Sequence, residues 1–141
     1  MVQAGMRRRL LWHGVLLFLL GLLVGIAVPA FRNPRMGLTA HVGTVLSGIV
    51  LWLAGAAWDE LRLSARATAA TFWSGLFANY VNAAALVAAA MLGTSRSTPI
   101  AGAGFAGTAV QEAMVDALLY GGAVVTFAWC GLLLWAFRGR E

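Results

Sequence analysis

The fold is decided by residues 10–31, which read LLWHGVLLFLLGLLVGIAVPAF and contain no charged side chain. A hydrophobic run of this length can cross a ~30 Å hydrocarbon core as an α-helix. Three further runs are similarly apolar, at residues 38–58, 67–92 and 109–137. All four runs should be helical, because unpaired backbone groups are too costly in lipid. The sequence therefore predicts an all-α membrane protein, a bundle of four transmembrane helices in one domain that spans residues 1–141.

The charges of the chain act as topology signals. The chain has 61% hydrophobic and 11% charged residues and a net charge of +5, and its basic residues are all arginines at the ends of the apolar runs. This placement argues against a nucleic-acid partner and for orientation by inner-side positive charge. If the N-terminus is inside, the inner arginines are Arg7, Arg8, Arg9, Arg62, Arg66, Arg138 and Arg140, and the outer ones are Arg32, Arg35 and Arg96. We therefore predict that both termini are cytoplasmic.

Two carboxylates interrupt the last apolar run. Glu112 and Asp116 are four residues apart, so a helix presents both on one face. An acidic side chain within the bilayer costs about 2.5–3.5 kcal/mol on insertion scales. This pair is therefore predicted to have a function.

Other polar side chains are predicted to share the depth of these carboxylates. His41 and Ser47 lie in the outer half of the second run, and Asn79, Tyr80 and Asn82 lie near the middle of the third. Successive runs cross the membrane in opposite directions, so all of these residues are expected at a similar depth in the membrane. Polar groups that converge in lipid are typical of a buried site. The segment 93–107 would cover this level, either as a lid or as a plain connector.

The first run carries a separate histidine and a face of small residues. His13 lies near the inner end, on the order of 20 Å from His41 by helical rise, so one metal cannot bind both. We expect His13 to bond a backbone carbonyl. Gly14, Gly21 and Gly25 share a face that allows close helix packing, either within one chain or between subunits.

Four segments together resemble a known family of enzymes. They read RRLLWHGVLLFLLG at residues 8–21, NPRMGLTAH at 33–41, NYVN at 79–82 and QE at 111–112. In this order they resemble the bacterial hydroxylaminobenzene mutases, and more distantly the styrene oxide isomerases, which are small four-helix membrane enzymes. The resemblance implies a multi-pass isomerase of the bacterial inner membrane. Its substrates would be arylhydroxylamines such as hydroxylaminobenzene, converted to 2-aminophenols by intramolecular hydroxyl transfer.

The resemblance also implies a cofactor and an assembly. The styrene oxide isomerases bind haem b between the subunits of a homotrimer through a histidine of the second helix. At that position this chain carries His41, the predicted axial ligand and the predicted metal-binding residue. Ser47 occupies the position where the isomerases have a substrate-facing asparagine, and we group it with His41 at the cofactor. A ferric haem would act as a Lewis acid on the substrate oxygen.

The catalytic residues predicted beside this cofactor are Asp116, Glu112, Asn79, Asn82 and Tyr80. One carboxylate would stabilise positive charge that develops on the aromatic ring. Asp116, one turn deeper than Glu112, is the better candidate for proton transfer. Asn79 or Asn82 would orient the substrate in place of the missing asparagine.

Other classes of function remain compatible with the residues. The chain could be a proton-coupled small multidrug exporter that uses Glu112 and Asp116, or a haem epoxide isomerase. A haem electron carrier would normally have two axial ligands, and His41 is the single histidine at its depth.

Overall fold

The computed structural model describes residues 2–138, with side chains described from residue 4. Its elements are α1 (Val2–Ala27), η1 (Val28–Ala30), α2 (Pro34–Ala56), η2 (Trp58–Glu60), α3 (Ala65–Leu92) and α4 (Ala109–Ala136). The four α-helices are each long and apolar enough to cross a membrane, and residues 2–138 contain no strand. The prediction of an all-helical protein with four helices long and apolar enough to span a membrane is confirmed for the described residues. Arg140, one of the arginines assigned to the inner side, lies outside the described residues.

The largest difference from the predicted boundaries is in the first helix. α1 begins at Val2 rather than at Leu10, because the arginines at 7–9 continue the helix beyond its apolar part. It ends at Ala27, and Pro29 lies in the 3₁₀ turn that follows. Proline has no backbone N–H to donate, so it favours the end of a helix at this point. Hydropathy therefore located the membrane-spanning part of α1 and not the whole helix.

The remaining helix ends follow local capping rules. The Asn33 side chain accepts a hydrogen bond from the first turn of α2, and Pro34 occupies the first helical position. α4 begins with a capping box formed by Thr108 and Gln111. α3 ends at Leu92 and is followed by Gly93, whose φ of +67° is in the left-handed region that glycine adopts without strain.

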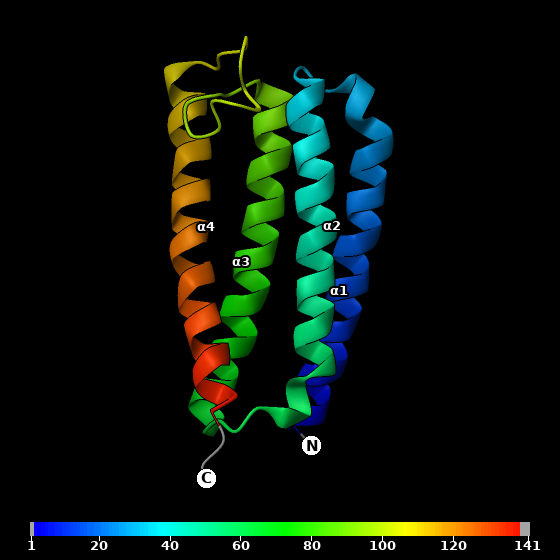
Figure 1. The fold of residues 1–141 in the computed structure, drawn as a ribbon, viewed down its shortest axis with the longest axis vertical. Coiled ribbons are helices and arrows are strands. Elements are labelled where there is room, and N and C mark those ends of the chain that lie inside the picture. The colour runs from blue at the N-terminus through cyan, green and yellow to red at the C-terminus, as the bar shows by residue number, and fades with distance from the viewer. Residues whose placement is uncertain (1, 139–141) are drawn as a thin grey trace.

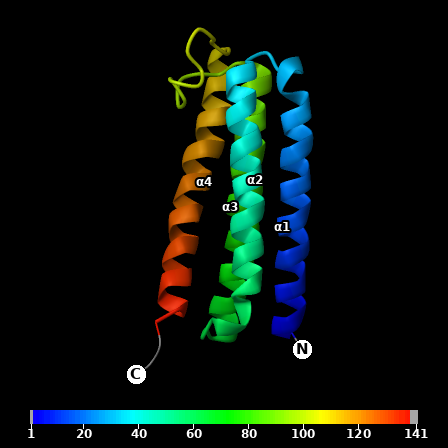
Figure 2. The ribbon, with the colours of Figure 1, turned by 45° about the vertical axis from the view of Figure 1, so that its right-hand side comes forward.

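The helices form an open row (Figure 1). α1 packs on α2, α2 on α3 and α3 on α4, each pair antiparallel, and α4 packs against no other described helix. Figure 2, turned by 45°, shows α1 and α4 on opposite sides of the central pair. α1 begins and α4 ends at the same end of the molecule, and the segment 93–107 covers the other end. The predicted assignment of the first end to the cytoplasm stays a prediction.

Small residues bring α1 and α2 into close contact. A Cβ added at Gly14 or Gly21 would lie 2.7 Å from atoms of Trp52 or Val45 on α2. A Cβ added at Gly25 would lie 2.6 Å from Nδ1 of His41. The glycine face therefore packs within the chain, which decides between the two expectations from the sequence. It is not available as a subunit interface in this fold.

Candidate functional site

His41 lies in the seam between α1 and α2. Its Nδ1 is 2.7 Å from the carbonyl oxygen of Gly21 on α1. The ring reaches this carbonyl because Gly25, one turn further along α1, has no side chain to obstruct it. A carbonyl oxygen can only accept, so Nδ1 must carry the proton. In the neutral ring Nε2 then has the lone pair, and this is the form in which histidine binds a metal.

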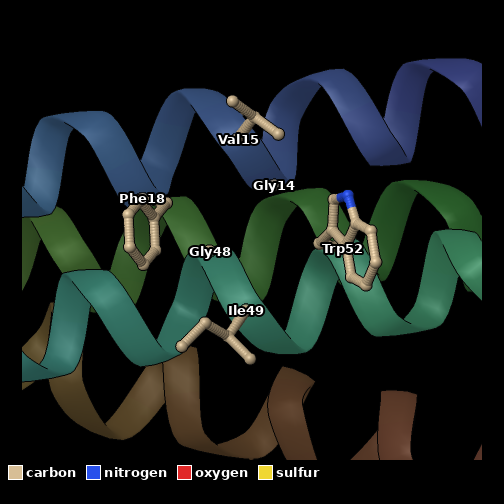
Figure 3. Close-up of a pocket in the computed structure, with 6 residues that line it drawn as sticks. All are labelled: Gly14, Val15, Phe18, Gly48, Ile49 and Trp52. Carbon is tan, nitrogen blue, oxygen red and sulfur yellow. The ribbon is translucent and has the colours of Figure 1, made fainter.

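The seam itself is apolar (Figure 3). A groove of about 210 Å³ runs between α1 and α2, with Phe18 and Trp52 on either side of the close approach of Gly14 and Gly48. Among the described residues that line it, Trp52 has the one polar side-chain group, an indole N–H that only donates hydrogen bonds.

Ser47 and Asn82 join α2 to α3 at mid-height. The Asn82 side-chain amide donates to Ser47 Oγ over 3.2 Å. Asn79 donates instead to the carbonyl of Gly75 in its own helix, over 2.8 Å. Asn79 and Asn82 both line a cavity of about 300 Å³ between α3 and α4, whose wall also includes Thr126. The two asparagines thus offer amide groups to any molecule that enters this cavity.

Tyr80 faces another cavity and pairs with the histidine of α1. Its hydroxyl is 2.8 Å from Nδ1 of His13. The expectation that His13 would bond a backbone carbonyl is wrong, because Tyr80 reaches from α3 to meet it. Tyr80 also lines a cavity of about 460 Å³ between α1 and α3.

Glu112 anchors the segment 93–107. Its carboxylate is buried and accepts from the backbone N–H groups of Ser95 (3.1 Å), Arg96 (3.0 Å) and Gly107 (2.9 Å). Charge-assisted bonds of this kind are stronger than neutral ones. The carboxylate therefore holds the segment against the N-terminal end of α4.

Asp116, one turn deeper, holds the same segment through side chains. It is 2.5 Å from the Arg96 guanidinium and also accepts from Ser97 Oγ. Arg32 donates to the carbonyls of Leu92 and Ala106. Further donors from the start of α2 are the side chains of Asn33 and Arg35. The segment is thus a well-anchored cap, and both carboxylates are engaged with it.

The predicted site residues therefore lie in three places within one chain. His41 contacts α1, Glu112 and Asp116 contact the cap, and the other predicted residues lie at mid-height along α2 and α3. Within the part of the chain that the structure describes, no group of three or more His, Cys, Asp or Glu side chains could hold a metal ion.

Comparisons with known proteins define the class of this molecule. The chain is 39% identical over 137 residues to hydroxylaminobenzene mutase HabB of Ectopseudomonas oleovorans, which covers 96% of this chain and 84% of that protein. It is 36% identical over 116 residues to hydroxylaminobenzene mutase HabA of the same organism, covering 82% of this chain and 86% of that protein. Together with the four membrane-spanning helices, these relatives define a multi-pass membrane enzyme that catalyses an isomerisation.

The family follows from a second comparison. The family model for styrene oxide isomerase matches residues 6–138. The chain belongs to the styrene oxide isomerase family. No solved structure matches it at a significant level.

Several partners of these residues could not be predicted from the sequence. The Gly21 carbonyl behind His41 is a backbone group, and side-chain patterns do not report it. The pairing of His13 with Tyr80 depends on the axial position of α3 relative to α1. One signal was present: Thr108, Gln111 and Glu112 together are typical of a tightly capped helix start, where a carboxylate is stabilised by backbone N–H groups.

Proposed function

We propose that this enzyme converts arylhydroxylamines of the hydroxylaminobenzene type to 2-aminophenols by intramolecular transfer of the hydroxyl group. The observation that carries the proposal is the similarity to two hydroxylaminobenzene mutases, one of them over 96% of the chain. A second candidate activity, isomerisation of an epoxide, is favoured by the match of the styrene oxide isomerase family model to residues 6–138.

The proposed cofactor is haem b, which His41 would hold. The donor chemistry of the site fits this group. Nδ1 of His41 is committed to the Gly21 carbonyl, and the same bond fixes the ring and leaves Nε2 as the metal-binding atom. Haem brings four ligands of its own, so a single histidine is sufficient where a bare metal ion would need a cluster. When bound, a ferric haem would supply Lewis-acid polarisation of the substrate's oxygen.

We assign roles to the protein side chains from the polar groups that they can offer to a substrate. The rearrangement moves the hydroxyl from nitrogen to the ortho carbon, removes the proton from that carbon and returns a proton to nitrogen. The amides of Asn79 and Asn82 can orient the polar end of a substrate, with Ser47 fixing Asn82. Tyr80, paired with His13, can donate or accept a proton at its hydroxyl.

The carboxylates are proposed to act at the capped end of the protein. Asp116 is proposed as the base for the ring proton, and Glu112 holds the cap in place. Both carboxylates already accept hydrogen bonds from the segment 93–107. Proton transfer by Asp116 therefore requires the contact with Ser97 or Arg96 to loosen during turnover.

A homotrimer with haem between subunits is the proposed assembly. The open row leaves the outer face of α4 uncovered: Phe127 is 80% exposed and Val124 is 69% exposed. α1, at the other end of the row, exposes Ile26 and Trp12 in the same way. Docking of α4 of one copy against α1 or α2 of the next would bring the carboxylates of one subunit toward His41 of another. Native mass spectrometry of the detergent-solubilised protein should give three chains per particle.

The proposed function is tested with the purified protein in detergent. Hydroxylaminobenzene and styrene oxide are supplied separately, and products are separated by chromatography. Conversion of hydroxylaminobenzene to 2-aminophenol above a heat-denatured control is the expected result. Isomerisation of styrene oxide alone would favour the epoxide as the substrate. Inactivity toward both substrates in haem-replete protein would refute both candidate activities.

A further inference from the structure

A second cavity, lined in part by Thr44 and Tyr80, lies between α1 and α3. It has a volume of about 460 Å³ and a wall built mostly from apolar side chains, among them Leu17 and Val87. Leu20 and Leu23 belong to its rim and are 39% and 52% exposed, so the cavity opens sideways onto the apolar surface of the helices. A molecule dissolved in the lipid phase could enter it without crossing a polar barrier.

One wall residue, Thr44 of α2, has an unusual environment. Its side chain is 2% exposed, and its hydroxyl has no hydrogen-bond partner among the described residues. Five other hydroxyl side chains in these helices bond the carbonyl four residues earlier: Thr39, Thr68, Thr71, Ser74 and Thr126. Thr44 departs from this pattern. A buried hydroxyl without a partner is costly and requires an explanation.

The other polar group in the wall is the phenol of Tyr80, which is bonded to His13. None of the described residues that line the cavity has a charged side chain. An apolar cavity of about 150 Å³ is enough to bind benzene, so this one has room for a substituted ring. A ligand that matches the wall is therefore neutral, has one aromatic ring and carries a substituent that can hydrogen-bond.

We propose that this cavity holds the aromatic substrate and product between the lipid and the reacting position, apart from the cavity that Asn79 and Asn82 line. The hydroxyl of Thr44, which is buried in the empty cavity, turns about χ1 to hold their polar substituent. Thr44 follows His41 by one helical turn, so the cavity begins next to the proposed cofactor ligand. Thr44 acts as a binding residue, and Tyr80 supplies the second polar contact. The identity of the ligand as an arylhydroxylamine rests on the proposed function, whereas the class of ligand rests on the cavity.

The test is equilibrium binding of 2-aminophenol, with toluene as a ligand that lacks polar groups, to the full-length protein in one detergent. Thr44→Val replaces the hydroxyl with a methyl group of similar size. It should weaken 2-aminophenol binding by about 3- to 10-fold, the loss expected for one neutral hydrogen bond, and leave toluene binding unchanged. Thr44→Ser should bind both ligands as the wild type does. Thr71→Val is the matched control, because the Thr71 hydroxyl is also buried but already bonds Ala67.

A second variant keeps the test decisive if Thr44→Val fails to fold. Ala84 lines the cavity and is exposed, so Ala84→Phe can fill the opening without disturbing the core. This variant should abolish binding of both ligands. Unchanged affinity for 2-aminophenol in Thr44→Val, or wild-type binding in Ala84→Phe, would overturn the proposal. Protein that binds 2-aminophenol in a Thr44-dependent manner but does not turn over hydroxylaminobenzene would retain the cavity assignment and refute the proposed function instead.

Discussion

Replacement of Glu112 by alanine should release the cap over the end of α4. The substitution removes the acceptor for the backbone N–H groups of Ser95, Arg96 and Gly107. Each buried donor left without a partner costs about 1–3 kcal/mol, which gives an upper range of about 3–9 kcal/mol. Water can reach part of this exposed segment, so we expect a loss of about 3 kcal/mol in the free energy of unfolding.

Glu112→Gln should give an intermediate result. The remaining carbonyl oxygen can keep the contacts with Ser95 and Gly107, but the new NH₂ group faces the N–H of Arg96, and two donors do not bond. The expected loss is about 1–3 kcal/mol. Glu60→Ala is the matched control, because Glu60 is exposed at the opposite end of the molecule.

Thermal unfolding in detergent and limited trypsin digestion measure the two consequences. Trypsin cleaves after arginine, so a released segment should become sensitive between Arg96 and Ser97. Wild-type melting and wild-type resistance to trypsin in Glu112→Ala would refute the anchoring role. If Glu112→Gln instead loses turnover while its stability is unchanged, the carboxylate acts in the reaction and not on the cap.

The remaining predictions concern the cofactor and the second carboxylate. His41→Ala should lower haem content after purification by at least ~10-fold, since even the loss of an outer partner of a metal ligand typically lowers affinity ~10–100-fold; an unchanged haem absorption band would exclude His41 as ligand. Gly25→Ala places a Cβ 2.6 Å from His41 Nδ1 and must displace the ring, so it should lower haem content while His41 is still present, and wild-type content would contradict the seam geometry. Asp116→Asn should reduce turnover by ~10²–10⁴-fold if Asp116 is the base. Its melting temperature should change little, because the Arg96 side of the ion pair is more than half exposed and exposed ion pairs contribute little to stability. Equal turnover in Asp116→Asn and wild type would remove Asp116 from the mechanism.

Much of the fold could be predicted because lipid restricts what a backbone can do. Four apolar runs gave four helices, and short connections gave antiparallel neighbours. The predicted start of α1 was less accurate, because a helix can continue past the apolar part of its sequence. The openness of the row could not be predicted, since hydropathy does not distinguish an apolar face that packs in the chain from one that faces lipid or another subunit.

The candidate site was predicted less well, for geometric reasons. Helical spacing placed Glu112 and Asp116 on one face and at a shared depth with His41, but depth alone does not bring side chains together. α4 packs only on α3 among the described helices, so the carboxylates turn to the cap and not to α2. His41 was identified by resemblance, and the reason it can serve as a ligand, the bond from Nδ1 to Gly21, required the structure.

The central claim is that the hydroxyl group moves within one substrate molecule. The most direct measurement is turnover of hydroxylaminobenzene labelled with ¹⁸O on nitrogen, in unlabelled water, with mass spectrometry of the 2-aminophenol formed by the purified protein. The proposed function predicts that the product retains the label. Product that carries oxygen from water would show that the hydroxyl leaves and water attacks the ring, and would contradict intramolecular transfer.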